Sequence, residues 1–182
     1  MPDELRLRRY EPRDQERVLA LEREALESVD ARPDDDDWAD DLRAVRETYL
    51  DAGGEFLVGE LGGDDLLDAG ASPRDEAAAK LVAMGGLKRV DATTAEVTRM
   101  RVAPDHHRKG FGEEVLLALE ERAADLGYET LELETTARQE AAQSLYEKHG
   151  YECVGTGTYG RFELLSYRKL LGSREPESPT SE

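Results

Sequence analysis

Cysteine, histidine and long apolar runs are all scarce in this sequence of 182 residues. A single cysteine, Cys153, excludes a disulfide within the chain. One cysteine and three histidines are a poor ligand set for a structural zinc site, so we expect no metal. No apolar run approaches the roughly 18 to 20 residues of a membrane span, and residues 1–25 interleave charges where a signal peptide needs apolar residues. These absences favour a cytoplasmic protein without a membrane partner.

Positive charge is scarce as well, because 42 acidic residues face 24 basic ones and the formal net charge is -18. Only five of the basic residues are lysines, which leaves 19 arginines. We therefore expect no nucleic-acid partner. A negative surface poor in lysine favours adaptation to a very salty cytosol, where the Debye length falls from about 10 Å at 0.1 M salt to about 3 Å at 1 M and screens self-repulsion. The alternative is an ordinary acidic protein from a low-salt cell.

The hydrophobic pattern predicts one α/β domain over residues 1–172, followed by a disordered tail at 173–182. Strands are expected at residues 4–10, 54–61, 80–90, 95–102 and 130–135, with an antiparallel pair over 151–171. Helices are expected from Pro12 past Leu26, over residues 37–50, from Phe111 to the "LGY" at 126–128, and over 138–150. The Gly- and Asp-rich segment 62–79 reads as a loop. A strand, a helix and a strand across 95–135 predict a right-handed crossover between two parallel strands.

One basic turn stands out in this acidic chain: "HHRKGFG", residues 106–112, between a predicted strand and a predicted helix. A helix N-terminus leaves amides unpaired and carries about half a positive charge, which suits a phosphate group. Gly110 and Gly112 lack Cβ atoms and permit close approach, while Arg108 and Lys109 add full charges. The pattern predicts an anion site. The alternative is a plain turn whose bases neutralise nearby acids.

Two known phosphate-binding loops can be compared with this turn. A Walker loop ends in Gly-Lys-Ser/Thr, whereas here Gly112 is followed by two glutamates, so that loop is excluded. A dinucleotide-binding fold is nearer, because Glu132 lies 20 residues beyond Gly112, close to where a ribose-binding acid falls. Its third glycine is replaced by Val115, however, and seven residues separate the strand from Gly110. Dinucleotide binding stays as an alternative.

The stretches "VAPDHHRKGFG" and "LELETTARQEAAQSLYEKHGY" together resemble the acetyl-CoA loop and the following strand and helix of the GNAT superfamily of N-acetyltransferases. The resemblance covers residues 95–155 and implies an α/β fold with a twisted mixed sheet, in which two parallel strands splay apart, flanked by about four helices. It also implies that acetyl-CoA, as cosubstrate, pairs with the strand and the turn, and that Gln139 lies near its pantetheine arm. His107 stands where the family has Gln or Arg, and Gln139 where it often has Asn. The cofactor-binding residues expected on this basis are Met100, Arg101, Val102, His107, Arg108, Lys109, Gly110, Phe111, Gly112 and Gln139.

The same resemblance implies direct transfer of an acetyl group from acetyl-CoA to a primary amine, without an acyl-enzyme. Only about one in 2500 molecules of an amine with a pKa near 10.4 is neutral at pH 7, equivalent to roughly 4.6 kcal/mol, so a base is needed. Glu96 resembles the acid that acts as base in some members, and Tyr146 the tyrosine that faces the sulfur. The alternatives are an exposed strand acid for Glu96 and a packing role for Tyr146.

A second function fits the same motifs, and the motifs do not specify the acceptor. The competing function is a catalytically silent module that binds acyl-CoA. The acceptor is a small-molecule or peptide amine of unspecified identity, and a homodimer is suggested only by the habits of the family. Of the remaining conspicuous residues, Cys153 reads as a small core residue of an apolar strand, and His106 and His107 read as exposed loop residues.

Overall fold

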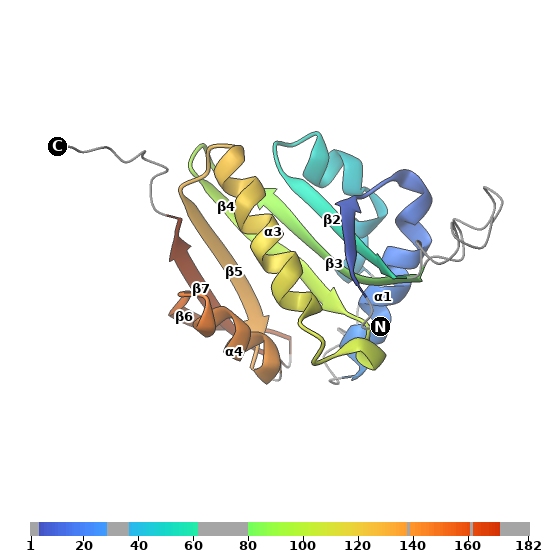
Figure 1. The fold of residues 1–182 in the computed structure, drawn as a ribbon. Helices are drawn as coiled ribbons and strands as arrows, with labels where there is room; N and C mark the ends of the chain where they lie inside the picture. The colour runs from blue at the N-terminus through green and yellow to red at the C-terminus, as the bar shows by residue number, and fades with distance from the viewer. Residues whose placement is uncertain (1–3, 29–36, 62–79, 138, 161, 172–182) are drawn as a thin grey trace, which may run out of the picture.

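The computed structural model describes residues 4–28, 37–61, 80–137, 139–160 and 162–171. Within them, one mixed sheet of seven strands has the order β1-β2-β3-β4-β5-β7-β6 (Figure 1). The predicted α/β fold with a mixed sheet is confirmed, whereas the predicted loop 62–79 and tail 173–182 lie outside the described residues. The strands are β1 (Arg6–Arg9), β2 (Glu55–Leu61), β3 (Lys80–Arg89), β4 (Thr94–Val102), β5 (Thr130–Thr136), β6 (Glu152–Tyr159) and β7 (Phe162–Leu170).

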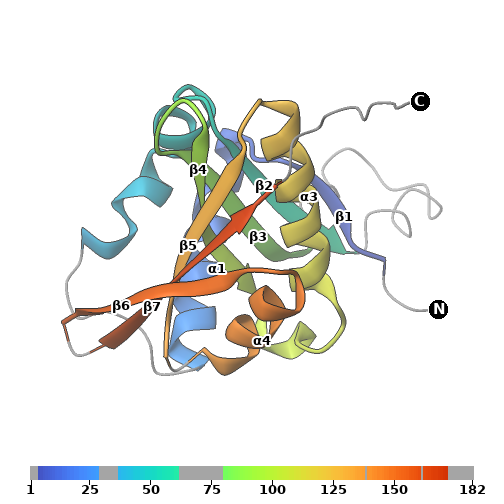
Figure 2. The same cartoon turned by 90° about the vertical axis from the view of Figure 1, so that its left-hand side faces the viewer.

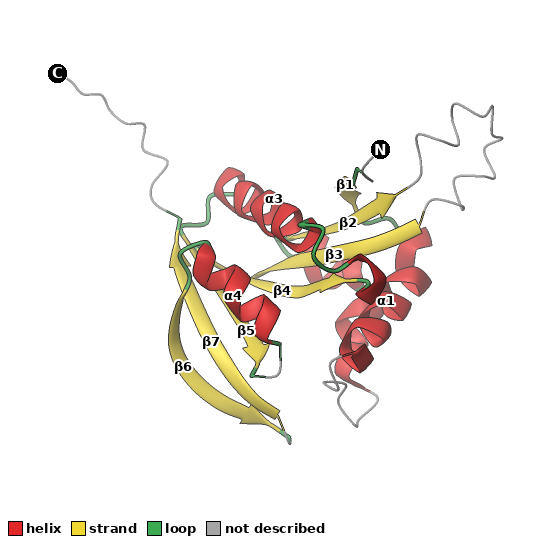
Figure 3. Ribbon diagram, turned by 60° about the horizontal axis from the view of Figure 1, so that its bottom comes forward, coloured by secondary structure: helices red, strands yellow, loops and turns green. Residues whose placement is uncertain are grey.

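Three α-helices of the described residues cover the two faces of this sheet. They are α1 (Gln15–Ser28), which continues a 3-10 turn η1 (Pro12–Asp14), α3 (Phe111–Asp125) and α4 (Glu140–Lys148). The helix α3 packs on β2, β3 and β4, and α1 packs on β3 and β4 from the opposite face (Figures 1 and 2). Figure 3 shows α4 on the same side of the sheet as α3. Both faces of the central strands are therefore covered.

The helix predicted over residues 37–50 is wrong in type. The chain forms a 3-10 segment η2 (Asp37–Arg43) and a π-helical turn η3 (Arg46–Leu50), and Ala39 has a non-helical backbone with φ -120° and ψ 23°. The apolar stripe was nevertheless read correctly at Leu42 and Val45, which are buried. Tyr49 packs edge-on against Phe56 with ring centroids 5.1 Å apart. Such tertiary contacts override the weak intrinsic preference for a regular helix.

The helix α3 matches its prediction closely. Its apolar residues Phe111, Val115, Leu119 and Ala123 recur every fourth position and are all buried. Burying one such large side chain contributes about 1.5 to 3 kcal/mol. The helix is thereby fixed on β3 and β4, and its first two residues, Phe111 and Gly112, are the last two of the basic turn.

The prediction that Cys153 is a core residue is wrong, because its side chain is exposed. The strand β6 is the last strand of the sheet and pairs only with β7. Its residues 152–158 are all exposed, Val154 at 54%. The apolar residues around Cys153 thus predicted the strand β6 correctly, but they did not predict that its side chains are exposed.

The strands β4 and β5 separate part of the way along the sheet. They pair in parallel, as predicted, only from Thr94↔Thr130 to Val97↔Leu133. Beyond that point β5 stays paired with β7 as far as Thr136↔Leu164, and β4 stays paired with β3. Along their later halves, β4 and β5 are therefore not paired with each other, and the edges that face each other have no partner strand. Two parallel strands need a crossover connection, which here runs from the end of β4 at Val102 through the basic turn and α3 to β5.

The described residues contain neither a helix that could span a membrane nor a cluster of metal ligands. None of the helices found there is long and apolar enough to cross a membrane. In the same residues no group of three or more His, Cys, Asp or Glu side chains is arranged to hold a metal ion.

Candidate active site

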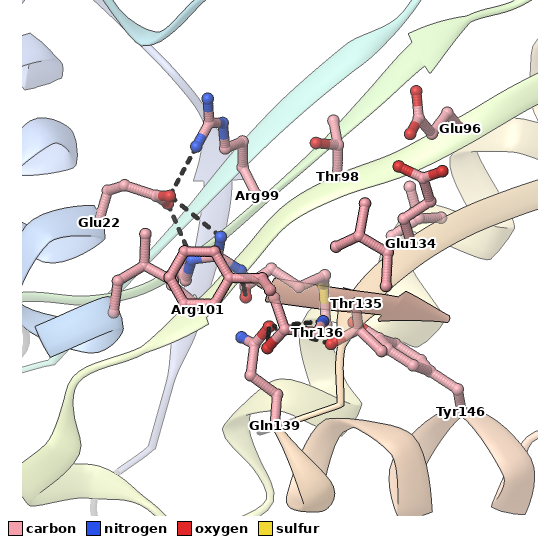
Figure 4. Close-up of a pocket in the computed structure, with 15 residues that line it drawn as sticks. Glu22, Glu96, Thr98, Arg99, Arg101, Glu134, Thr135, Thr136, Gln139 and Tyr146 are labelled. Carbon is pink, nitrogen blue, oxygen red and sulfur yellow. Dashed lines mark hydrogen bonds and ion pairs between the residues drawn. The ribbon is translucent and has the colours of Figure 1, made fainter. Parts of the chain in front are cut away.

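A pocket of about 320 Å³ fills the gap between the separated halves of β4 and β5. Pockets that bind small molecules begin at about this volume. Figure 4 shows side chains from both strands, from α1 and from α4 converging on it. The lining residues are Glu22, Leu26, Glu96, Val97, Thr98, Arg99, Met100, Arg101, Glu134, Thr135, Thr136, Gln139, Tyr146, Phe162 and Leu164.

A β-bulge in β4 shapes one wall of this pocket. Thr98 pairs with Gly86 and Arg101 pairs with Met84, so β4 has one more residue than β3 across this interval. Arg99, inside the bulge, has a left-handed backbone with φ 58°, a conformation that costs a non-glycine residue roughly 1 to 2 kcal/mol. Bulges bend a strand and re-aim its side chains.

Buried ion pairs hold the bulge in place. Glu22 of α1 is fully buried, accepts a hydrogen bond of 2.6 Å from Arg99 Nη1, and lies 2.9 Å from Arg101 Nε. Arg99 also donates to Asp41 at 2.5 and 3.0 Å. Burial alone would raise the pKa of Asp41, but the hydrogen bonds and charge of Arg99 outweigh it and lower that pKa. Tyr49 donates its hydroxyl hydrogen to the same carboxylate. The network joins η2 and α1 to β4.

Tyr146 enters the pocket from α4. Its side chain is only 5% exposed and packs between Tyr151 and Tyr167, with ring centroids 5.8 and 6.0 Å away. Its hydroxyl group has no hydrogen-bond partner among the described residues. Burial raises its pKa to about 12, so the group is a neutral hydrogen-bond donor at neutral pH. Figure 4 shows the ring directed from α4 toward the gap between the strands.

Glu96 and Glu134 lie at the other end of the pocket, with Thr98 beside them (Figure 4). Glu96 is half-buried, and burial raises its pKa, with the negative charge of Glu134 adding to the effect. Within the described part of the chain, neither carboxylate forms an ion pair. A carboxylate with a raised pKa inside a pocket is a candidate general base.

The basic turn leads from β4 into α3. Gly110 has φ 81°, and a Cβ atom placed on it would meet nothing within 4 Å. The first amide bonded into the helix is that of Glu114, which donates to the Gly110 carbonyl at 3.1 Å, so the helix itself does not use the three amides before it. A Cβ atom on Gly112 would lie 3.6 Å from Val102 and 3.7 Å from Leu145. The start of α3 therefore adjoins both the end of β4 and helix α4.

The side chains of the turn are arranged less favourably for a ligand than its backbone. Phe111 is buried and stacks on His106 at 6.2 Å between ring centroids. His107 is exposed, as predicted, and its Nε2 lies 3.0 Å from the Val102 carbonyl oxygen, while His106 is only half-buried. Lys109 Nζ lies 3.0 Å from His106 Nδ1. Arg108 is exposed with φ 67°.

Gln139, the last residue predicted to contact the cofactor, is engaged locally. Its Oε1 accepts hydrogen bonds from the Thr136 amide at 3.2 Å, the Thr136 hydroxyl at 3.0 Å and the Thr135 hydroxyl at 3.1 Å. It therefore fixes the turn from β5 into α4.

Five of the residues predicted for the site line one pocket: Glu96, Met100, Arg101, Gln139 and Tyr146. Val102 and the turn 107–112 do not line that pocket and lie at the end of β4 and the start of α3.

The sequence prediction missed Glu22, Thr98, Arg99 and Glu134, which also line the pocket. Only Glu134 gave a signal, since it alternates with Glu132 in "TLELET". Glu22 and Arg99 are 77 positions apart, and no local pattern reports such a pair.

Known proteins are similar to this chain both in sequence and in fold. The sequence model of the Acetyltransferase (GNAT) family matches residues 16–151, which is more than half of the chain. The chain belongs to the GNAT acetyltransferase family. The resemblance noted in the basic turn and in α4 is thereby confirmed.

Two curated relatives support this GNAT membership. The chain is 39% identical over 84 residues to the uncharacterized N-acetyltransferase YsnE of Bacillus subtilis, a match that covers 44% of this chain and 56% of YsnE. It is 26% identical over 127 residues to member 5 of N-acetyltransferase family 8 of Mus musculus, covering 70% of this chain and 50% of that protein. The matches thus span about half the length of each relative.

Solved structures share the GNAT fold. An acetyltransferase of the GNAT family from Staphylococcus aureus Mu50 superposes with a TM-score of 0.76 at 17% identity, covering 92% of this chain and 99% of that one. The protein yncA of Salmonella typhimurium, solved with its cofactor acetyl-CoA, superposes with a TM-score of 0.66 at 18% identity, covering 96% and 99%. At these identities the likeness concerns the fold.

Proposed function

We propose that this protein transfers an acetyl group from acetyl-CoA directly to a primary amine. The observation that carries the proposal is the pocket between β4 and β5, which has a buried tyrosine hydroxyl without a described partner at one end and a half-buried carboxylate at the other. An acceptor group and a donor group facing one cavity suit a reaction that takes a proton at one place and needs a hydrogen bond at another.

The residues present fit coenzyme A. The positive φ of Gly110, the open space around it and the three amides at the start of α3 that the helix leaves unused form a cradle for a diphosphate. The stretch of β4 at residues 98–101, which has no partner strand on its β5 side, offers backbone groups to the pantetheine amides. When bound, acetyl-CoA supplies an acetyl group activated as a thioester.

Glu96 and Tyr146 each have a defined part in this scheme. Glu96 takes the proton from the acceptor, directly or through water, so that its nitrogen can form a bond to the acetyl carbon. The Tyr146 hydroxyl donates a hydrogen bond to the sulfur as the bond between carbon and sulfur breaks. A thiol with a pKa near 8.5 is a stronger acid than this tyrosine, so Tyr146 acts as a hydrogen-bond donor rather than by complete proton transfer.

Calorimetry with acetyl-CoA and turnover with a panel of primary amines test the proposal. We expect binding with one molecule per chain and release of the CoA thiol that depends on an amine. Binding without release for any amine would replace this function by that of a silent acyl-CoA-binding module. Absence of binding would refute both.

A further inference from the structure

The three carboxylates that line the pocket differ in their partners. Glu22 is paired with two arginines, Arg99 at 2.6 Å and Arg101 at 2.9 Å. Glu134 has only the Ser166 hydroxyl, at 3.5 Å, and Glu96 has no hydrogen bond or ion pair with any residue in the described ranges. Two carboxylates of the same pocket therefore lack a positive partner.

The register of the sheet places these two carboxylates on one face. Glu96 of β4 stands opposite Glu132 of β5, and Glu134 lies two residues further along the same strand. Two residues along a strand span about 7 Å and return to the same face. Glu132 is neutralised by Arg168 at 3.1 Å. Lys88, opposite Glu96 on β3, forms no ion pair with it. Glu96 and Glu134 thus form a separate acidic pair at the end of the pocket (Figure 4).

Among the residues that line the pocket, no positive side chain forms an ion pair with Glu96 or Glu134, although the charge of Lys88 acts on Glu96 from β3. Arg99 and Arg101 are balanced by Glu22 and Asp41, so the two remaining carboxylates carry two negative charges. After burial, the negative charge of Glu134 is the next cause that raises the pKa of Glu96. Ligand cations at both positions would relieve this repulsion.

A second observation indicates that this cavity receives a ligand. The Tyr146 hydroxyl is aimed into the same pocket from a side chain that is 95% buried, and among the described residues nothing accepts its hydrogen. Because the side chain around it is buried, an acceptor atom on a bound molecule would satisfy this hydroxyl, and in the proposed function that atom is the sulfur of acetyl-CoA.

We propose that the acceptor is a small aliphatic diamine or polyamine, whose reacting amine lies beside Glu96 while a second ammonium group pairs with Glu134. This inference rests on the proposed acetyl transfer. An amine with one charge leaves Glu134 without a partner, and an amine that carries a carboxylate is repelled by it. Glu134 is in this sense the specificity-determining residue.

Three acceptors with the same four-carbon chain test the inference: 1,4-diaminobutane, n-butylamine and 4-aminobutanoate. The measurement is the release of the CoA thiol from acetyl-CoA at one fixed salt concentration. Because Glu134 is exposed, pairing with it should raise kcat/KM for the diamine about two- to fivefold above n-butylamine. The 4-aminobutanoate should be the poorest substrate. Equal kcat/KM for the diamine and n-butylamine would overturn the proposal.

A pair of matched variants tests the part of Glu134. Glu134→Gln should remove the preference for the diamine, so that within this variant kcat/KM for the diamine falls to the value for n-butylamine. Glu163→Gln changes the net charge equally, at an exposed position of β7 between the pocket residues Phe162 and Leu164 and hence on the other face. It should keep the preference. A preference that survives Glu134→Gln would assign selectivity elsewhere and refute the proposal.

Binding separates this inference from the proposed function. Calorimetric titration of the complex with CoA should detect the diamine but not n-butylamine. If the diamine binds selectively while no amine is acetylated, the acceptor class stands and the catalytic proposal fails. If n-butylamine is acetylated as fast as the diamine, catalysis stands and the acceptor class fails. If no amine binds or reacts, both are wrong.

Discussion

Glu96 is the residue whose protonation should set the lower pH limit of activity. Its pKa is raised by burial and by Glu134, and it accepts a proton only when ionised. As the pH falls through this raised pKa, kcat/KM should therefore decrease at a pH above the ordinary range of a glutamate. Glu96→Gln should lower kcat/KM about 100-fold and remove that decrease. A pH profile of kcat/KM for both proteins measures this.

The slope that remains in Glu96→Gln should reflect only deprotonation of the acceptor ammonium. Glu152→Gln, an exposed change of the same kind on β6, serves as the control and should keep the wild-type profile. If Glu96→Gln retains the acidic limb, another group is the base.

Tyr146 should contribute to turnover but little to affinity. Tyr146→Phe keeps the ring between Tyr151 and Tyr167 and removes only a hydroxyl without a partner in the described residues. We expect kcat to fall about 10- to 100-fold, while the Kd for acetyl-CoA and the thermal midpoint stay close to wild type. Stopped-flow turnover, calorimetry and a melting curve measure the three quantities. An unchanged kcat would leave Tyr146 as a packing residue.

Single residues were predictable from the sequence where a local motif marks them. Glu96 and Tyr146 flank recognisable segments, and both line the pocket. Glu22 and Arg99 carry no such mark, because their pairing depends on how α1 crosses β4. Cys153 shows the opposite error: its neighbours predicted burial, whereas its strand lies at the edge of the sheet.

At the scale of elements, a substitution at the start of α3 should affect acetyl-CoA binding without lowering the stability of the fold. A Cβ atom on Gly112 meets Val102 and Leu145 only at ordinary contact distance, and alanine favours a helix over glycine by about 1 kcal/mol. Gly112→Ala should therefore fold at least as stably as wild type. It should nevertheless weaken acetyl-CoA binding about tenfold, by obstructing one amide contact to the diphosphate.

Gly110→Ala is the matched change two residues earlier. There φ is 81°, so alanine should lower the free energy of unfolding by about 1 kcal/mol through backbone strain. Denaturant titration and calorimetry on both variants measure the contrast. Wild-type affinity in Gly112→Ala would show that coenzyme A does not approach this turn.

The link between α1 and the bulge of β4 should be costly to break. Glu22→Gln takes a fully buried carboxylate partner away from the half-buried Arg99 and Arg101, and removing one partner of such an ion pair costs about 3 kcal/mol. Glu24→Gln, exposed on the same helix, should change the free energy of unfolding by less than about 0.5 kcal/mol. Urea titration compares the two. Equal stability would mean that the network is dispensable.

Most elements were predictable from periodicity, since each strand and α-helix of the described chain lies within a few residues of its expected position. Two features were not. The segment 37–50 winds as 3-10 and π turns because contacts of Tyr49 outweigh its helical pattern. The second is the bulge of β4, because one extra residue in a strand leaves no mark in the composition. The separation of β4 and β5 itself was expected from the family resemblance.

For the whole molecule, we propose that the net charge of -18 makes folding depend on concentrated salt. Self-repulsion between surface acids is screened within about 3 Å at 1 M salt but extends over about 10 Å at 0.1 M. Dialysis from 2 M KCl to 20 mM should therefore lower the far-ultraviolet circular dichroism signal and the thermal midpoint. A spectrum that is the same at both concentrations would identify an ordinary acidic protein.

The exposure of Cys153 has a practical consequence. It is the one thiol of the chain, and it lies on the outermost strand and outside the pocket lining. A maleimide dye should consequently attach at a single defined position and leave the site open. Fluorescence anisotropy of the labelled protein would then report tumbling, and hence whether one chain or two move together in solution.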